Sequence, residues 1–349
     1  MTLHLSHEVL HLGLREPFRI ARSDHDAGRA VTTVVVELRD DRFPGLVGIG
    51  EGYPERFYGE TVETMVAVTP LLLDAVGEPD PTSAALVAAG ERMAAAIAHH
   101  GGAKCALDVA LHDLVGKVSG RTITDLLDLH GPIPPTDFTL GLDEPAVVAE
   151  RAVRAAHFPA LKIKCGGPAD LATLEAVRAV YGGPIRVDAN TGWQPEDALA
   201  LLPELERLGV ELIEQPFAAR RLDQLRWLQE RSSLPIVADE SAVTIDDLDG
   251  LVGVVAGVNV KLAKCGGIGP ARAMLSRARA LGFRTFLGCM EETSIVIAAS
   301  AAVASLADWV DLDGNLLLAA DPFTGLVLDD GCRWRLAETP GLGIERRPA

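Results

Sequence analysis

The spacing of hydrophobic and polar residues changes character twice along this chain. Near the beginning, residues 31–38 (VTTVVVEL) form a β-type run, and residues 3–14 and 45–52 are its expected antiparallel neighbours. From Thr61 onward the hydrophobic spacing becomes helical, with alanine-rich amphipathic stretches. Strands followed by helices predict a small α+β domain over residues 1–125.

A second pattern covers residues 126–320, where short hydrophobic runs alternate with helical stretches. Eight of these runs are expected strands, at residues 138–140, 161–163, 185–187, 211–213, 236–238, 258–262, 285–287 and 309–312. They recur about every 25 residues, and so regular an alternation favours a closed barrel of the (β/α)8 type over an open doubly wound sheet. Residues 321–349 are rich in turns and are expected to fold back onto the first domain.

Charged residues stand at the ends of these expected strands. In residues 160–167 (ALKIKCGG), Lys162 and Lys164 lie on the same face of a strand, because side chains alternate with a period of two. Further along, strands end in Asp188, Glu214, Asp239, Lys261 and the pair Asp311 and Asp313. Neighbouring positions are about 25 residues apart, which matches the repeat of the fold. In a barrel these ends form one ring at the C-terminal mouth, where barrel enzymes carry their active sites.

Three of these strand ends predict a metal site. Asp188, Glu214 and Asp239 offer the hard oxygen ligands that Mg2+ prefers. Each one alone would be read as a helix cap or a solvated acid, but the register of all three favours a metal. Lys164 and Lys261 would flank this site, where a metal can stabilise a substrate carboxylate while a lysine removes the α-proton. We expect Lys162, a like charge on the same face, to lower the pKa of Lys164.

Composition narrows the classes of function and partner. With 32 basic and 49 acidic residues the formal net charge is -17, which argues against nucleic acid and anionic membrane surfaces as partners. The five cysteines form no Cys-x-x-Cys pair, which indicates a reducing compartment. Residues 1–14 do not have the pattern of a signal peptide, and the longest uncharged run, residues 293–307, is too short to span a bilayer. We therefore expect a cytoplasmic protein, for which a homo-oligomer stays open.

The strand-end motifs resemble those of the enolase superfamily, and within it the muconate lactonizing subgroup, over essentially the entire chain. The matching motifs are Lys162-Ile163-Lys164, Asp188-Ala189-Asn190, Glu214-Gln215-Pro216, Asp239-Glu240-Ser241 and residues 259–267, together with Gly50-Glu51 and residues 103–117 in the first domain. The resemblance implies a modified barrel, (β/α)7β, with an α+β capping domain at residues 1–125 that the tail, residues 321–349, completes. It also implies Asp188, Glu214 and Asp239 as Mg2+ ligands, with Asn190 and Glu240 in supporting positions.

The same resemblance implies two acid/base lysines on opposite faces of the substrate. These would be Lys164 and Lys261, with Lys261 preferred over Lys264 because the family's lysine is the first of the two on that strand. No histidine occurs after His157, so the histidine base of the mandelate racemase branch has no candidate on the late strands. Two-lysine chemistry is therefore the version expected here.

Asp311-Leu312-Asp313 resembles the aspartate pair that holds the substrate's N-terminal ammonium in dipeptide epimerases. Period two puts both carboxylates on one face, where they could bind one cation. The expected reaction is then a 1,1-proton transfer, through an enediolate, at the α-carbon of a dipeptide's C-terminal residue. Three related activities stay as alternatives, namely o-succinylbenzoate synthase, N-succinylamino acid racemase and muconate cycloisomerase. A non-catalytic metal-binding or sensor protein is the remote alternative.

Substrate preference is expected to depend on the loop at residues 21–29 of the capping domain and on Met290. In that loop, Arg22 could bind a glutamate side chain, as in L-alanyl-D/L-glutamate epimerases. Asp24 and His25 would instead suit a cationic or polar side chain. Both interpretations stay open at the level of sequence.

Overall fold

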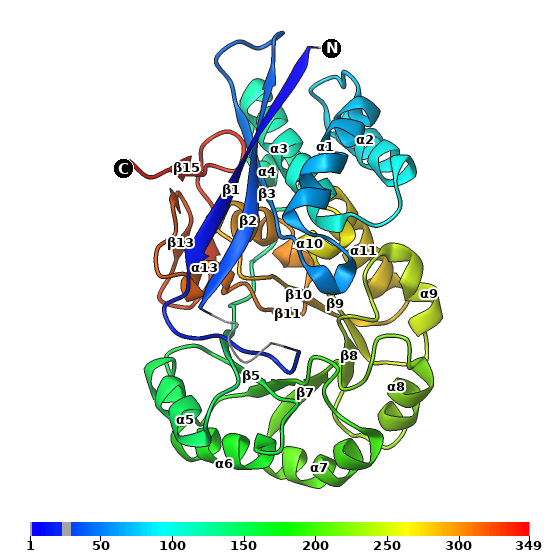
Figure 1. The fold of residues 1–349 in the computed structure, drawn as a ribbon, viewed down its shortest axis with the longest axis vertical. Coiled ribbons are helices and arrows are strands. Elements are labelled where there is room, and N and C mark those ends of the chain that lie inside the picture. The colour runs from blue at the N-terminus through cyan, green and yellow to red at the C-terminus, as the bar shows by residue number, and fades with distance from the viewer. Residues whose placement is uncertain (1, 23–28, 349) are drawn as a thin grey trace.

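A computed structural model describes residues 2–22 and 29–348. Its first domain begins with an antiparallel sheet of β1 (Leu3–Gly13), β2 (Ala30–Asp40) and β3 (Gly48–Gly52) in that order, as expected. A short η1 (Arg56–Tyr58) precedes the helices α1 (Val62–Val76), α2 (Ser83–Ala96), α3 (Gly101–Ser119) and α4 (Ile123–Leu127). Figure 1 shows these helices beside the three strands, above the barrel.

Glycines allow helix α3 to lie directly on strand β3. A Cβ atom at Gly48, Gly50 or Gly52 would come within 2.0–2.2 Å of a carbonyl oxygen of α3. No side chain fits at such a distance, so the glycine at every second position of β3 makes one face of the strand flat enough for the helix. This packing fixes the strand that leads into the loop at residues 53–58, which reaches the barrel mouth.

The second domain is a barrel of eight parallel strands. The strands are β4 (Phe138–Leu140), β5 (Leu161–Lys164), β6 (Ile185–Asp188), β7 (Val210–Glu214), β8 (Ile236–Ala238), β9 (Gly257–Lys261), β10 (Arg284–Gly288) and β11 (Trp309–Val310), hydrogen-bonded in chain order. A parallel bridge between Thr136 and Val310 joins the first and last strands. All eight expected strands are present, with ends within two residues of the expected positions.

Seven helical connections link the eight strands, so the described barrel is (β/α)7β. The connecting helices are α5 (Pro145–Arg154), α6 (Asp170–Val180), α7 (Pro195–Arg207), α8 (Leu222–Gln229), α9 (Leu248–Leu251) with η2 (Ile245–Asp247), α11 (Ile268–Ala280) with the short α10 (Leu262–Cys265), and α12 (Ser294–Ala301) with η3 (Ala304–Leu306). The spacing alone predicted a (β/α)8 barrel, and this prediction was wrong in one respect, because no long helix follows the last strand in the described chain. After β11 the chain makes only the four-residue α13 (Gly314–Leu317) and then leaves the barrel.

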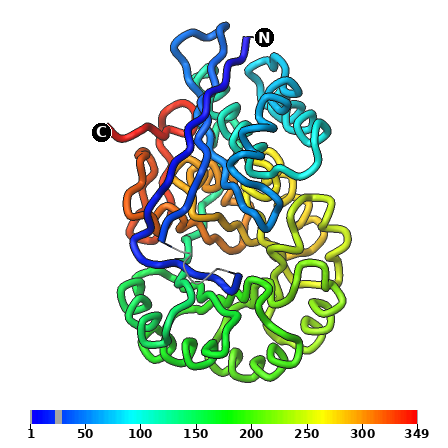
Figure 2. Tube along the Cα trace, viewed as in Figure 1, coloured from blue at the N-terminus to red at the C-terminus, as the bar shows by residue number. Residues whose placement is uncertain are grey.

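The tail packs against both domains. It contains the short strands β12 (Phe323–Thr324), β13 (Val327–Leu328), β14 (Trp334–Arg335) and β15 (Glu345–Arg346). The Leu342 amide donates to Asp113 Oδ1 of α3 at 2.8 Å, and the Trp334 indole donates to the Leu312 carbonyl at 2.8 Å. Figure 2 shows the red end of the tube beside the first strands, and Arg346 near that end forms an ion pair with Glu8 of β1.

Residues 14–22 run from β1 across the mouth of the barrel. The Arg15 amide donates to the Leu317 carbonyl at 2.9 Å, and the Leu142 amide donates to the Arg19 carbonyl at 2.8 Å. The substrate-binding candidates Asp24 and His25, in the loop that follows, lie outside the described residues. Across the described part of the chain, the helices are too short or too polar to cross a membrane.

Candidate active site

A pocket opens at the C-terminal ends of the barrel strands and is lined by both domains. It gathers the predicted residues Arg22, Lys162, Lys164, Asn190, Asp239, Lys261, Met290, Asp311 and Asp313. It also contains residues that the sequence did not single out, namely Phe18, Ile20, Glu55, Thr139, Cys289, Glu291, Gly314 and Leu317. The strand ends thus form the floor of this pocket, and residues 18–22 and 55–58 form part of its rim.

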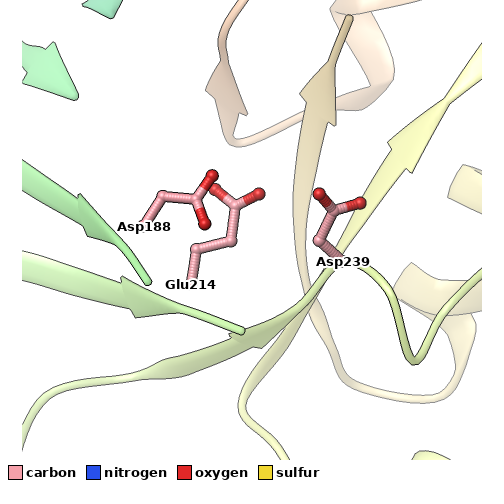
Figure 3. Close-up of side chains that lie close together, drawn as sticks. All are labelled: Asp188, Glu214 and Asp239. Carbon is pink, nitrogen blue, oxygen red and sulfur yellow. The ribbon is translucent and has the colours of Figure 1, made fainter. Parts of the chain in front are cut away.

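Three buried carboxylates from adjacent strands converge beside the pocket. Asp188 ends β6, Glu214 ends β7 and Asp239 follows β8, and each offers an oxygen within 4.8 Å of the others. In Figure 3 the carboxylates of Asp188 and Glu214 point toward one another, with Asp239 across from them. Burial, together with the charge of Asp188, raises the pKa of Glu214 to about 7. Carboxylates kept this close repel one another, and a divalent cation bound by oxygen ligands would relieve the repulsion.

The chemistry of the donor set therefore fits a magnesium ion. All three ligands are oxygens, and within the described residues this is the one group of acidic, histidine or cysteine side chains with suitable spacing. Glu214 Oε2 is buried, accepts no hydrogen bond of good geometry within the described part of the chain, and lies 2.8 Å from Lys162 Nζ. That one ammonium is shared with Asp188 and Asp311, so a further cation would still relieve the repulsion among the carboxylates.

The two lysines of β5 have different surroundings. Lys164 Nζ lies 2.7 Å from Asp188 Oδ2 and lines the pocket. Lys162 Nζ is 1% exposed and lies 3.1 Å from Asp188, 2.8 Å from Glu214 and 2.8 Å from Asp311. Burial opposes the charge of Lys162, but these carboxylates outweigh it and hold its pKa well above the usual value. Lys162 is therefore a shared counter-ion, and its expected effect on the pKa of Lys164 stays a prediction.

Lys261 and Lys264 both contact the third carboxylate but from different sides. Lys261 ends β9, lines the pocket and lies 2.9 Å from Asp239 Oδ2. Lys264, in α10, is fully buried and donates to Asp239 Oδ1 at 2.5 Å and to three backbone carbonyls, those of Asp239, Ala242 and Asn259. Burial raises the pKa of Asp239, but Lys261 and Lys264 outweigh burial and hold it well below its usual value. Of the two lysines, only Lys261 faces the pocket.

Asp311 and Asp313 follow β11 and both line the pocket. Thr139 holds the pair, because its hydroxyl donates to Asp311 Oδ1 at 3.0 Å and its amide donates to Asp313 Oδ2 at 2.6 Å. Asp311 also accepts from Lys162 at 2.8 Å, so its charge already has a partner within the protein. Burial and the charge of Asp311 raise the pKa of Asp313 to about 8. The two carboxylates therefore share one face of the pocket but differ in their partners and in the direction of their pKa shifts.

On the rim, the side chain of Arg22 is held by contacts within the protein. Its guanidinium forms an ion pair with Glu240 and lies 4.2 Å from the centre of the Phe57 ring. Asn190 donates from its side chain to the same Glu240 oxygen at 3.3 Å. The backbone amide of Asn190 donates to Asp188 Oδ1 at 2.9 Å, which links this group to the carboxylate triad. Asn190 and Glu240 thus connect the triad to the rim.

Three of the residues that the sequence did not reveal look ordinary at the level of sequence. Thr139 is an uncharged residue on β4, the one early strand without a charged end, so the search for charges in register passed over it. Phe18 and Ile20 lie in an irregular segment and look like ordinary hydrophobic positions in a link. Only their position across the barrel mouth gives them a role at the site.

Comparison with known proteins agrees with the fold. The model of the mandelate racemase / muconate lactonizing enzyme N-terminal domain matches residues 7–128, and the enolase C-terminal domain-like model matches residues 145–349. The chain is 36% identical over 337 residues to the L-Ala-D/L-Glu epimerase of Bacteroides thetaiotaomicron, covering 95% of this chain and 85% of that protein. It is 37% identical over 356 residues to the L-Lys-D/L-Arg epimerase of Methylococcus capsulatus, covering 96% of each.

Among solved structures, a dipeptide epimerase from Enterococcus faecalis V583 complexed with Mg and the dipeptide L-Leu-L-Tyr superimposes with a TM-score of 0.90. It is 32% identical, and the match covers 99% of this chain and 100% of that one. The relatives thus share the described architecture but carry names for acidic, basic and hydrophobic substrates. On these matches, which together cover nearly the whole chain, the protein belongs to the mandelate racemase / muconate lactonizing enzyme family of the enolase superfamily.

Proposed function

We propose that this protein is an isomerase, a Mg2+-dependent dipeptide epimerase that inverts the α-carbon of the C-terminal residue of a dipeptide. The observation that carries the proposal is one pocket that combines a buried carboxylate triad, a lysine on either side of it and a separate aspartate pair. The triad suits a metal and the lysines suit proton transfer, while the aspartate pair suits an ammonium group. A dipeptide carries both a carboxylate and an ammonium group at the required ends.

In this proposal the metal is held by Asp188, Glu214 and Asp239. Bound Mg2+ would neutralise the substrate carboxylate and so make the α-proton more acidic. Lys264 and Lys162 keep these ligands in place, because they hold Asp239 and the pair of Asp188 and Glu214 by short contacts. The metal ligands are thus positioned by the protein's own charges before any substrate arrives.

Proton transfer is assigned to Lys164 and Lys261, since the third lysine in the pocket lining, Lys162, is 1% exposed and paired with three carboxylates. One of Lys164 and Lys261, in its neutral amine form, accepts the α-proton from one face of the substrate, which leaves an enediolate. The other, as an ammonium, donates a proton to the opposite face, so the α-carbon is inverted and no proton is lost overall. Each step of this kind commonly contributes about 10^2 to 10^4 in rate. In the reverse reaction the two lysines exchange roles, because the α-proton of the other epimer faces the second lysine.

Binding of the substrate's N-terminal ammonium is assigned to Asp311 and Asp313. This assignment favours dipeptides over the substrates of N-succinylamino acid racemase, o-succinylbenzoate synthase and muconate cycloisomerase, which lack a free ammonium. Asp311 and Asp313 are both buried, and the ammonium of a dipeptide would bring the pair a cation in addition to Lys162, which substrates without an ammonium cannot do. We also propose a cytoplasmic location, which is consistent with five free cysteines in the described chain.

A dipeptide library in D2O with Mg2+ tests the proposal directly. We expect deuterium uptake at the α-carbon of the C-terminal residue, measured by mass spectrometry, that stops on removal of Mg2+ and that Lys164→Ala keeps for at most one of the two epimers of each dipeptide. The matched control is Lys104→Ala, because Lys104 donates to the Ile97 carbonyl in the capping domain, outside the pocket. A wild-type enzyme that exchanges no dipeptide but racemises N-succinyl amino acids would overturn the dipeptide assignment.

A further inference from the structure

Behind the aspartate pair lies a third carboxyl group, Asp137, that no step above uses. It directly precedes β4 at the seam where the barrel closes, and its amide donates to the Val310 carbonyl at 3.1 Å. Asp137 is 0% exposed and does not line the pocket. Its Oδ2 accepts a hydrogen bond from Arg186 at 2.8 Å. Its Oδ1 is buried and accepts none within the described residues.

The carboxyl groups of Asp137 and Asp311 are neighbours, because the Asp137 amide is bonded to Val310, the residue before Asp311, and the two side chains influence each other's pKa. Two buried carboxyl groups in contact cannot both be ionised at low cost, so one of them must carry a proton. The described donors point to Asp137 as that group. Asp311 already accepts from Lys162 at 2.8 Å and from Thr139 at 3.0 Å, which stabilises its ionised form. Arg186, the one cation that contacts Asp137, is also paired with Glu211 at 2.8 Å.

The other charged and titratable groups that interact with Asp137 also favour a proton on Asp137. The described groups that interact with it are Asp311 and Asp313 after β11, Lys162 on β5, Arg186 on β6 and Tyr181 after α6. Lys162 is shared with Asp188 and Glu214, so it is not available as a full counter-ion for another carboxylate. Burial, followed by the charge of Asp311, raises the pKa of Asp137 well above its usual value.

We propose that Asp137 is a positioning residue that keeps a proton on Oδ1 and donates it in a hydrogen bond to Asp311. Asp311 is then fixed by three donors, Asp137, Thr139 and Lys162, and keeps its negative charge toward the pocket side. In its neutral form Asp137 adds no further negative charge behind the pair. The functional meaning rests on the proposed function, because Asp311 matters to activity as part of the ammonium site.

An infrared experiment tests the proton independently of activity. The full-length wild type and Asp137→Asn are compared at about pH 9, and we expect the difference spectrum to contain the carbonyl band of one protonated carboxylic acid. Asp40→Asn is the matched control, because a hydrogen bond from Arg42 lowers the pKa of Asp40 and its difference spectrum should show only a carboxylate. Absence of the acid band for Asp137 would overturn the inference, whatever the enzyme does with dipeptides.

Kinetics of two substitutions then test the positioning role. In Asp137→Asn the amide nitrogen can donate to Asp311 and the oxygen can accept from Arg186, so KM for a responsive dipeptide should stay within about threefold of wild type. Asp137→Ala removes both contacts, and KM should rise roughly tenfold or more, since a buried polar group left without its partner is destabilising. If Asp137→Asn is as damaging as Asp137→Ala, Asp137 is an ionised partner of Arg186 and the inference is wrong.

The two proposals fail in different ways. If the wild type epimerises no dipeptide but the acid band is present, the proposed function falls and the protonated Asp137 stands. If the wild type is active and the acid band is absent, the inference falls alone. Poor folding of Asp137→Ala would not affect the infrared result, which uses only wild type and Asp137→Asn.

Discussion

The floor and the rim of the pocket are built on different principles. On the floor, charged groups sit at the ends of regular strands, and buried carboxylates and lysines contact one another at 2.5–3.1 Å. On the rim, residues 18–22 and 55–58 come from irregular segments of the first domain and include Phe18, Ile20 and Tyr58. The floor can therefore hold one fixed chemistry, while the rim can change with few consequences for the fold. Relatives named for different dipeptides fit this division.

The largest expected effect on activity comes from removing Lys164 or Lys261, the two floor lysines assigned to proton transfer. We expect Lys164→Ala and Lys261→Ala each to lower epimerisation by about 10^2- to 10^4-fold, the range that general acid/base groups supply. Each single variant should also keep deuterium exchange with only one of the two substrate epimers, because one face retains its lysine. The measurement is exchange of the separate L- and D-isomers, followed by mass spectrometry. Equal residual exchange of both isomers would contradict the opposite-face assignment.

Metal dependence is the next test of the floor. Chelation should abolish epimerisation, and added Mg2+ should restore it. Added Mg2+ should also raise Tm in a concentration-dependent way, because a ligand at 100 times its Kd raises the free energy of unfolding by ~2.7 kcal/mol. In Glu214→Gln the Mg2+-dependent shift in Tm should be lost or much reduced, because a carboxylate ligand is missing. Glu196→Gln, in the exposed first turn of α7, is the control that should keep the shift. A shift that survives in Glu214→Gln would exclude Glu214 as a ligand.

The comparison of floor and rim also explains what the sequence could predict. The eight strands and their charged ends follow local rules, namely runs of hydrophobic residues, turns and a repeat of fixed length, so their positions were predicted within two residues. The contacts of Arg22 with Glu240 join residues 218 positions apart, and those of Thr139 with Asp313 join residues 174 apart. No local pattern encodes such pairs, because the first depends on how an irregular segment crosses the barrel mouth and the second on how the barrel closes between β4 and β11.

The ammonium site lies where floor and rim meet, and Asp313→Asn tests it. We expect KM for a free dipeptide to rise roughly tenfold, because a charge-assisted contact is lost, while an N-acetylated dipeptide should be affected much less. Steady-state kinetics with both forms of the same dipeptide provide the measurement. An equal rise in KM for both forms would mean that Asp313 does not bind the ammonium group.

The pH dependence of stability gives a second view of Asp313. Its pKa in the folded protein is raised to about 8 from an ordinary value of 3.8, mainly by burial. The unfolded chain ionises Asp313 first, so its contribution to stability is present below about pH 4 and is lost as the pH rises through about 8. Asp313→Asn should therefore gain Tm relative to wild type as the pH rises from 4 to 8. Asp329→Asn, whose partly exposed carboxylate has a lowered pKa, should show no such gain.

The smallest expected effect concerns the rim residue Arg22. Its guanidinium is already paired with Glu240 and placed over Phe57, so an acidic substrate side chain would have to compete with a carboxylate of the protein. We expect Arg22→Met to lower kcat/KM by about two- to fivefold, the loss of a partly exposed ion pair of ~0.2–1 kcal/mol, and to do so equally for acidic and neutral dipeptides. Arg56→Met, in η1 beside the same rim, is the control. A loss confined to acidic dipeptides would show instead that Arg22 leaves Glu240 to bind the substrate, and the rim would then carry specificity through a charge exchange between two carboxylates.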